Sequence, residues 1–196
     1  MMDEQILVIP EQALMELIDN KRGLISVNKE KAFKVIQERG CFKPRTEMET
    51  NPGYKQVIPY ILMKDSKGKV LVLKRLTTQS EKRLHNKLSL GIGGHVNSTD
   101  SEIPVEALKE GMKREIQEEV NVTLLETPRF QGIIYDDTTP VGKVHMGHAY
   151  SVTVDFFGLN EPDKFACSWE EPSQLKPLVK DMENWSGFLV DKLYRD

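Results

Sequence analysis

The chain has 196 residues, which is enough for one well-buried core and too few for two large domains. Its 27 lysine and arginine residues stand against 30 aspartate and glutamate residues. The resulting net charge of -3 excludes wholesale binding of a nucleic acid polymer and electrostatic recruitment to anionic lipid.

Three further features concern the compartment. The two cysteines, Cys41 and Cys167, lie far apart with no C-x-x-C spacing, so we expect reduced thiols and not a disulfide framework. No apolar run approaches the ~20 residues that a membrane-spanning helix needs. The acidic start, residues 1–4, also lacks the regions of a signal peptide. We therefore expect a cytoplasmic protein without a membrane partner.

Residues 1–50 are predicted to form a helical N-terminal extension. Pro10 suits a first helical turn, and apolar residues follow it at helical spacing, namely Leu14, Leu17 and Ile18. A second helix is predicted between Asn28, as its N-cap, and Gly40, as its stop. The charged, proline-containing segment 43–53 has no periodicity and is predicted to be a linker.

Residues 51–196 are predicted to form one domain that begins with strands. Two apolar runs, 57–63 and 70–73, flank turn residues and predict a buried hairpin. Alternating residues over 144–156 predict a strand with one core face. Further strands are predicted at 122–125 and 132–135, and a closing helix over 175–193. This order favours an α/β (α+β) fold in which helices cover both faces of a mixed sheet.

Two patterns overlap on the predicted helix 104–120. Apolar residues, at ~100° per residue, form one stripe that must face the core: Val105, Leu108, Met112, Ile116 and Val120. Beside this stripe, Glu115, Glu118 and Glu119 are neighbours at i,i+3 and i,i+4 spacing. A divalent cation would relieve their repulsion, and Mg²⁺ prefers such oxygen ligands. Because glutamate pairs are also common on solvated helix faces, the spacing alone leaves both interpretations open.

The residues around these carboxylates resemble the Nudix box of the MutT-related hydrolases, whose pattern is G-x5-E-x7-R-E-U-x-E-E-x-G-U with U apolar. The matching residues are Glu106, Arg114-Glu115-Ile116, Glu118-Glu119 and Val122. Eleven residues separate Gly94 from Glu106 where the pattern has five, so we predict an insertion within 96–104. Asn121 replaces the final glycine of the box, and asparagine also tolerates the left-handed conformation that ends a helix.

The resemblance covers residues 51–196 and leaves the first 50 outside it. Residues 70–75 and 88–94 resemble the family's second strand and the run into the box, although Ile92 stands where proline is common. Residues 169–175 resemble the tryptophan that precedes the last helix, and 81–87 resemble a subgroup of predicted MutT-like phosphoesterases. The implied fold is a Nudix-like α/β/α sandwich with a mixed β-sheet.

This resemblance implies a Mg²⁺-dependent hydrolase, with Mn²⁺ as a substitute ion, that cleaves a phosphoanhydride by water attack at phosphorus. The substrate would be a nucleoside diphosphate linked to another group, or a related pyrophosphate. The implied metal ligands are the carbonyl of Gly94 and the carboxylates of Glu115, Glu118 and Glu119, and Glu115 is our candidate for the general base. Asp163, or Glu161 in its place, would add a ligand, although a solvated loop acid is an equal alternative.

The other candidate residues support the site or contact the substrate. Arg114 would lock the loop against the helix through Glu106 or Glu118. The substrate-binding candidates are Arg75, Lys82, Arg83 and His95, with surface cations and loop packing as the alternatives. His145 and His148, three apart on a strand, point to opposite faces, which disfavours a shared metal, and His148 is predicted to be a core histidine.

Two other functions stay open at this point. The chain could be a non-catalytic module that binds a nucleotide, although its complete set of box carboxylates disfavours this. The first 50 residues could instead form a partner-binding arm or the contact of a homodimer. The substrate itself cannot be identified, because specificity in this family lies in loops outside the box.

Overall fold

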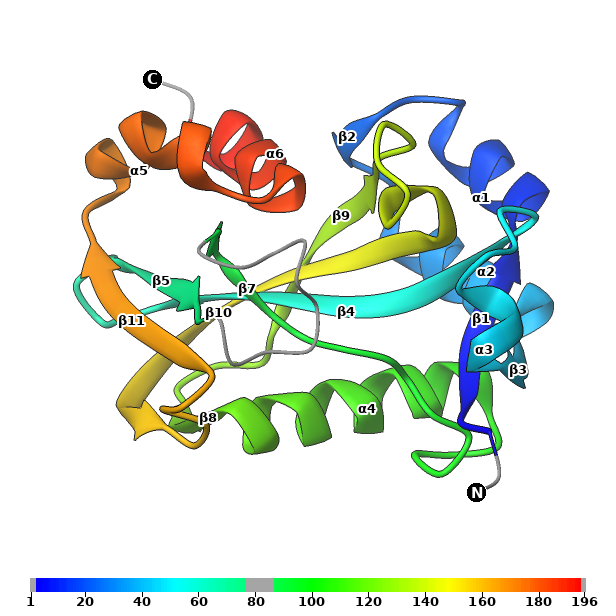
Figure 1. Cartoon of the computed structure of the whole chain (residues 1–196), viewed down its shortest axis with the longest axis horizontal. Coiled ribbons are helices and arrows are strands. Elements are labelled where there is room, and N and C mark those ends of the chain that lie inside the picture. Colours follow the sequence, from blue (N-terminus) through cyan, green and yellow to red (C-terminus); the bar gives the residue numbers. More distant parts are fainter. Residues whose placement is uncertain (1–2, 77–86, 195–196) are drawn as a thin grey trace. The chain divides into compact units, whose positions relative to one another are not determined.

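The computed structural model describes residues 3–76 and 87–194. The chain divides into two compact units, of which unit 1 comprises Met1–Tyr60, Gly93–Arg114 and Phe130–Ala149. Unit 2 comprises Ile61–Ile92, Glu115–Arg129 and Tyr150–Asp196. Elements that contribute several residues to each unit include β4 (Tyr54–Lys64), α4 (Pro104–Glu119) and β10 (His145–Leu159) (Figure 1).

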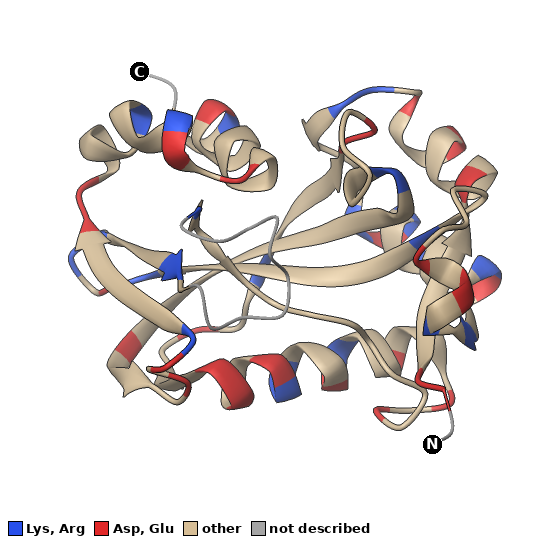
Figure 2. Cartoon of the chain, viewed as in Figure 1, with Lys and Arg blue, Asp and Glu red and all other residues tan. Residues whose placement is uncertain are grey.

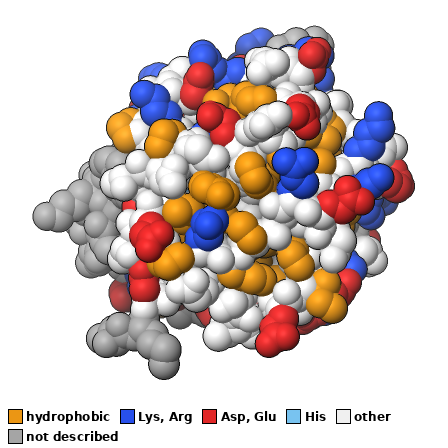
Figure 3. Space-filling model, turned by 90° about the vertical axis from the view of Figure 1, so that its right-hand side faces the viewer, with side chains coloured by type: hydrophobic (Ala, Val, Ile, Leu, Met, Phe, Trp, Pro, Cys, Tyr) orange, Lys and Arg blue, Asp and Glu red, His pale blue; other side chains and the backbone are white. Residues whose placement is uncertain are grey.

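Unit 1 contains the strands at the start of the chain and most of β9 (Arg129–Tyr135). β1 (Gln5–Pro10) pairs antiparallel with both β3 (Cys41–Pro44) and β4, and β2 (Gly23–Ile25) pairs antiparallel with β9. The helices are α1 (Glu11–Ile18), α2 (Lys29–Arg39) and α3 (Arg45–Met48). Figure 3 looks onto the side where these three helices lie, with hydrophobic side chains near the middle and charged side chains among and around them.

Both helices predicted in the first 50 residues are confirmed. Asn28 caps α2, because its side-chain oxygen accepts a hydrogen bond from the backbone N–H of Lys31 at 2.9 Å. The segment is not only helical, however, since it also carries β1, β2 and β3. The four consecutive residues Ile6 to Ile9 are fully buried, and so short a run has no period that distinguishes a strand from a helix. The predicted linker 43–53 contains the end of β3 and all of α3.

A histidine belongs to the core of unit 1, as predicted. His148 is 0% exposed, and its ring lies 5.1 Å from the ring of Phe33 and 4.5 Å from that of Phe130, measured between centroids. Burial lowers the pKa of His148 to about 3, with a smaller contribution from Lys29. The ring is therefore neutral in the folded protein at physiological pH.

Unit 2 contains the predicted hairpin. β5 (Val70–Arg75) pairs with β4 and, on its other side, with β11 (Phe165–Glu170). In the turn, the side chain of Asp65 accepts hydrogen bonds from the backbone N–H groups of Lys67 and Lys69, at 2.9 and 2.8 Å. Gly68 adopts a φ of 86°, which glycine tolerates best. The remaining strands of unit 2 are β6 (Leu88–Ser89), β7 (Gly91–Ile92) and β8 (Val120–Leu124), and β8 pairs with β10.

Two predictions in this part of the chain need correction. The single closing helix is in fact α5 (Pro172–Leu178), a 3-10 turn (Val179–Asp181) and α6 (Asn184–Leu193). The chain is extended at Met182 and Glu183 because these residues pair with β6: Met182 forms a parallel bridge with Leu88, and the N–H of Glu183 donates to the Leu88 carbonyl at 3.0 Å. In β10, Ser151 is buried, so the strand has core contacts on both faces there.

Candidate active site

The helix α4 has the two faces that its sequence predicted. Along the apolar stripe Leu108, Ile116 and Val120 are buried, and Val105 and Met112 are half-buried. Glutamate residues are frequent along the C-terminal half of the helix (Figure 2). Glu115 is buried, Glu119 is half-buried and Glu118 is exposed. The exposure of the three box carboxylates therefore increases from the core side to the solvent side of the helix within about one turn.

Glu119 lies in an unusually acidic environment within unit 2. Burial, together with the negative charges of Glu115, Glu161 and Glu183, raises its pKa to about 8, although the charge of Arg75 lowers it. Such a group takes up a proton or a cation more readily than an exposed glutamate does. Hard divalent ions prefer this donor chemistry, so the oxygen donors around Glu119 fit Mg²⁺ or Mn²⁺.

The side chains do not form a closed metal cage. Across 3–76 and 87–194, no three His, Cys, Asp or Glu side chains lie close enough together to hold a metal ion. Glutamate has three rotatable side-chain bonds, so these carboxylates can change position while the helix backbone stays in place. A bound ion would have to draw these carboxylates inward.

Two acidic residues outside the box act on Glu119. Glu161, named above as the substitute for Asp163, lies in the turn before β11, where it forms an ion pair with Lys164 at 2.5 Å. Asp163 is exposed, and its role as a metal ligand stays a prediction. Glu183 was missed in the sequence because it lies in the predicted closing helix. Its Oε1 accepts hydrogen bonds from the hydroxyls of Ser89 at 2.7 Å and Ser186 at 3.4 Å.

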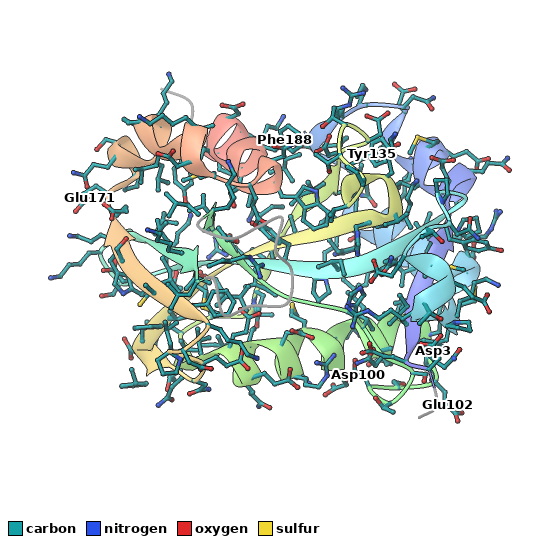
Figure 4. All side chains as sticks on the ribbon, in the orientation of Figure 1. Asp3, Asp100, Glu102, Tyr135, Glu171 and Phe188 are labelled. Carbon is teal, nitrogen blue, oxygen red and sulfur yellow. The ribbon has the colours of Figure 1, made fainter. Side chains whose placement is uncertain are left out.

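Arg114 locks the loop before α4, through a partner that we did not predict. Its guanidinium donates to both carboxylate oxygens of Asp100, at 2.8 and 3.1 Å, and to the carbonyl of His95 at 2.8 Å. Asp100 belongs to the inserted segment and lies beside α4 (Figure 4). Glu106, one of the two predicted partners, instead accepts a hydrogen bond from Lys109 at 2.8 Å.

Gly111 makes room for this clamp. A Cβ atom on Gly111 would lie 2.8 Å from Oδ2 of Asp100 and 3.3 Å from a methyl group of Val96. The loop therefore approaches the helix closely at this glycine, and the side chains of the loop make the contact. The insertion therefore supplies an anchor for the helix.

The two residues after Gly93 carry the predicted carbonyl ligand and a candidate substrate contact. Gly93 has a φ of 154°, and a side chain on it would begin 1.7 Å from the carbonyl oxygen of Pro59, so only glycine fits. His95 is half-buried, and its Nε2 lies 2.6 Å from Oε1 of Gln56. Burial lowers the pKa of His95 to about 3, and the charges of Arg45, His145 and Arg114 contribute.

Among the substrate-binding candidates, Arg75 interacts electrostatically with a carboxylate of the Nudix-box helix, Glu119. It ends β5, its guanidinium lies 5.4 Å from the ring centroid of Phe165, and its charge lowers the pKa of Glu119. Arg83 and Lys82, the other cationic candidates, lie outside the described residues.

A groove elsewhere in unit 1 contains no predicted site residue. It has a volume of about 360 Å³, lies between α1 and α2, and is lined by apolar and oppositely charged side chains: Ala13, Glu16, Leu17, Lys31, Lys34, Val35, Glu38 and Arg39. Lys34 and Glu38 pair with each other at 3.7 Å. None of the helices in the described part of the chain is long and apolar enough to cross a membrane.

Comparison with known proteins identifies relatives over nearly the whole chain. The chain is 33% identical to Protein YmaB of Bacillus subtilis (strain 168) over 203 residues, which cover 98% of each protein. It is 34% identical to Tm1382, whose crystal structure is described as that of a Nudix hydrolase, with a TM-score of 0.88 over 97% of this chain and 98% of that one. A scan against models of known protein families gives no match.

More distant structures share the fold alone. DR0079 from Deinococcus radiodurans is 19% identical, with a TM-score of 0.56 over 89% of this chain and 99% of that one. A MutT Nudix hydrolase from Burkholderia pseudomallei is 18% identical, with a TM-score of 0.51 over 71% and 98%. The mixed-sheet α+β fold, the acidic helix α4 and the full-length similarity to Tm1382 lead to one conclusion: this chain belongs to the Nudix hydrolase family.

Proposed function

We propose that this hydrolase cleaves a phosphoanhydride, in a nucleoside diphosphate linked to another group or a related pyrophosphate, and that it depends on Mg²⁺. One observation carries the proposal. Glu119, on the Nudix-box helix, is a partly buried carboxylate whose pKa is raised to about 8 by burial and by three neighbouring carboxylates. A divalent cation is the group that most directly compensates this arrangement.

The residues that would hold the ion are Glu115, Glu118 and Glu119 together with the carbonyl of Gly94, and Mn²⁺ would substitute for Mg²⁺. Glu161 supports an added ligand better than Asp163 does, because its charge acts on Glu119. When bound, the ion would screen the phosphate charge and stabilise the leaving oxygen. Glu115, buried beside the helix stripe, is our proposed general base, which takes the proton of the attacking water.

Cationic side chains would orient the substrate. Arg75, whose charge already acts on Glu119, would bind a phosphate oxygen next to the carboxylates, and Arg83 would add a second contact. Arg114 would not touch the substrate. It would hold the loop of Gly94 and His95 in place through its bidentate pair with Asp100.

We also propose a cytoplasmic location and a small molecule as the partner, with neither a nucleic acid polymer nor a membrane involved. Free thiols at Cys41 and Cys167 support a reducing compartment. Sedimentation of the purified protein would test whether the chain forms a homodimer.

The direct test is an assay of a panel of anhydrides with Mg²⁺ or Mn²⁺, comparing the natural protein with Glu118→Gln and Glu119→Gln. Each substitution should lower kcat by about two orders of magnitude or more, with folding retained. Glu110→Gln is the matched control, because Glu110 lies exposed on the same helix and pairs with Lys113, at 2.6 Å. Full activity of the double variant would rule out the assignment, and nucleotide binding without turnover by the natural protein would favour a non-catalytic module.

A further inference from the structure

A buried glutamine connects the N-terminal segment to His95. Gln56 lies on β4 and is 0% exposed. Its side-chain nitrogen donates to the carbonyl of Met48, on α3, at 3.2 Å, and its oxygen lies 2.6 Å from Nε2 of His95. A carbonyl can only accept, so the amide nitrogen must face Met48 and the amide oxygen must face His95.

This orientation determines which nitrogen of His95 carries the hydrogen. Because the oxygen of Gln56 only accepts, Nε2 of His95 must donate. At pH 8 an ordinary histidine is neutral and has a single N–H, so Nδ1 of His95 then carries a lone pair. The backbone is held as well, since Arg114 donates to the carbonyl of His95 at 2.8 Å. Both the ring and the main chain of His95 are thereby fixed directly after Gly94.

A second histidine in unit 1 has the opposite arrangement. Nδ1 of His145 lies 2.7 Å from the carbonyl oxygen of Val141, so Nδ1 must be the donor in that ring. The two ring centroids are 5.6 Å apart. His145 is therefore a nearby internal reference with the other tautomer.

We propose that Gln56 is a positioning residue that fixes His95 as the Nε2–H tautomer, so that Nδ1 accepts a hydrogen bond from an O–H group in the active site. This inference rests on the proposed function, which places the reaction beside Gly94. A lone pair repels an ionised phosphate oxygen, so the partner of His95 is a hydroxyl group of the substrate or the attacking water. The substrate hydroxyl would belong to a sugar or ribose attached to the diphosphate. The carbonyl of Met48, in the N-terminal segment, thus helps to orient Gln56 against His95.

The tautomer can be measured without any turnover. In protein labelled with ¹⁵N in its four histidines, nitrogen spectra at pH 8 should show His95 protonated at Nε2 and His145 protonated at Nδ1, with signals assigned by His95→Asn and His145→Asn. In Gln56→Met, of similar volume, the His95 signals should move to a tautomer mixture while those of His145 stay. Gln56→Glu keeps an acceptor for Nε2 and should keep Nε2 protonated. A His95 protonated only at Nδ1, or one unchanged in a folded Gln56→Met, would overturn the proposal.

Activity tests what His95 binds. His95→Asn can place an oxygen near the position of Nδ1 and should retain most of kcat/KM, whereas His95→Phe should lower it about tenfold or more. If the donor is a substrate hydroxyl, His95→Phe and the natural protein should have equal kcat/KM with the analogue that lacks this hydroxyl. If the donor is the attacking water, His95→Phe should lower kcat equally for the substrate and for its deoxy analogue. Equal activity of His95→Phe and the natural protein, or equal losses in both variants, would overturn the acceptor role. A natural protein that hydrolyses nothing would refute the proposed function, while the nitrogen spectra still report on Gln56.

Discussion

Burial of single ionisable side chains disfavours their charged forms in both units. It raises the pKa of Glu119 to about 8 and lowers the pKa of His95 and of His148 to about 3. At neutral pH both histidines are therefore neutral and Glu119 holds its proton for most of the time. A cation that binds Glu119 must first displace that proton.

This displacement makes metal binding depend on pH. The folded pKa of Glu119 lies above its ordinary value of 4.5, so the metal-free protein loses stability as pH rises from 4.5 through 8. Mg²⁺ binding should strengthen by up to about tenfold per pH unit below pH 8 and then level off, because one proton is released. Calorimetric titration at pH 6.5, 7.5 and 8.5 would measure it. Glu119→Gln should bind more weakly and without this dependence, and a constant affinity of the natural protein would contradict the prediction.

The residues of the site differ in how far the sequence reveals them. Glu115, Glu118 and Glu119 follow from helical spacing, because residues three and four apart share a face in any α-helix. Asp100 and Glu183 could not be found in this way. Each is separated by 14 residues or more from its partner Arg114 or Ser89, and only the folded loops bring them together.

At the scale of the element, α4 combines a core stripe, the box carboxylates and a contact with the inserted loop. The contact depends on Gly111, whose missing side chain leaves room for Asp100 and Val96. In a solvated helix alanine is preferred to glycine by about 1 kcal/mol. Here the loop removes that advantage.

A pair of substitutions separates helix propensity from loop contact. Gly111→Ala should lower the unfolding temperature and kcat, because its Cβ would lie 2.8 Å from the carboxylate that holds Arg114. Gly187→Ala, in α6, is the matched control: its Cβ would meet Val179 at 3.4 Å, an ordinary contact, and should stabilise by up to about 1 kcal/mol. Thermal unfolding and the anhydride assay would measure both. If Gly111→Ala is more stable and fully active, the loop moves to accept the added Cβ atom and the prediction is wrong.

Long periodic elements were predicted well and short or interrupted ones were not. α4, β10 and the β4–β5 hairpin each carry a clear period or turn signal. β1 and β3 have six and four residues, too few for a period, and the closing helix breaks because β6 pairs with Met182. Pairing between distant segments has no local signature.

For the whole molecule, the first 50 residues belong to the core of unit 1. β1 pairs with β4 as well as with β3, and Ile6, Leu7, Val8 and Ile9 are each 0% exposed. Whether these residues form a domain of their own stays a prediction. The buried strand nevertheless makes a detachable arm the less favoured alternative.

Removal of this segment should therefore unfold unit 1. A version that begins at residue 51 should aggregate or lose its sharp thermal transition, because β4 would expose the edge and the apolar surface that β1 covers. Leu7→Ala should cost about 2–5 kcal/mol, whereas Leu17→Ala, at a half-buried position of α1, should cost less. Size exclusion and denaturant unfolding would test these expectations. A monomeric, cooperatively folding truncated chain would contradict them.

Unit 1 is built from three separate segments of the chain, which affects when it can fold during synthesis. Its last stretch ends at Ala149, so the unit cannot close until about three quarters of the nascent chain has emerged. At a synthesis rate of about 5–20 residues per second, the apolar strand at residues 5–10 emerges roughly 7–28 seconds before the last residues of unit 1. During this delay it can pair with β3 and β4 alone, which makes it a natural target for a chaperone and a starting point for misassembly on a crowded polysome.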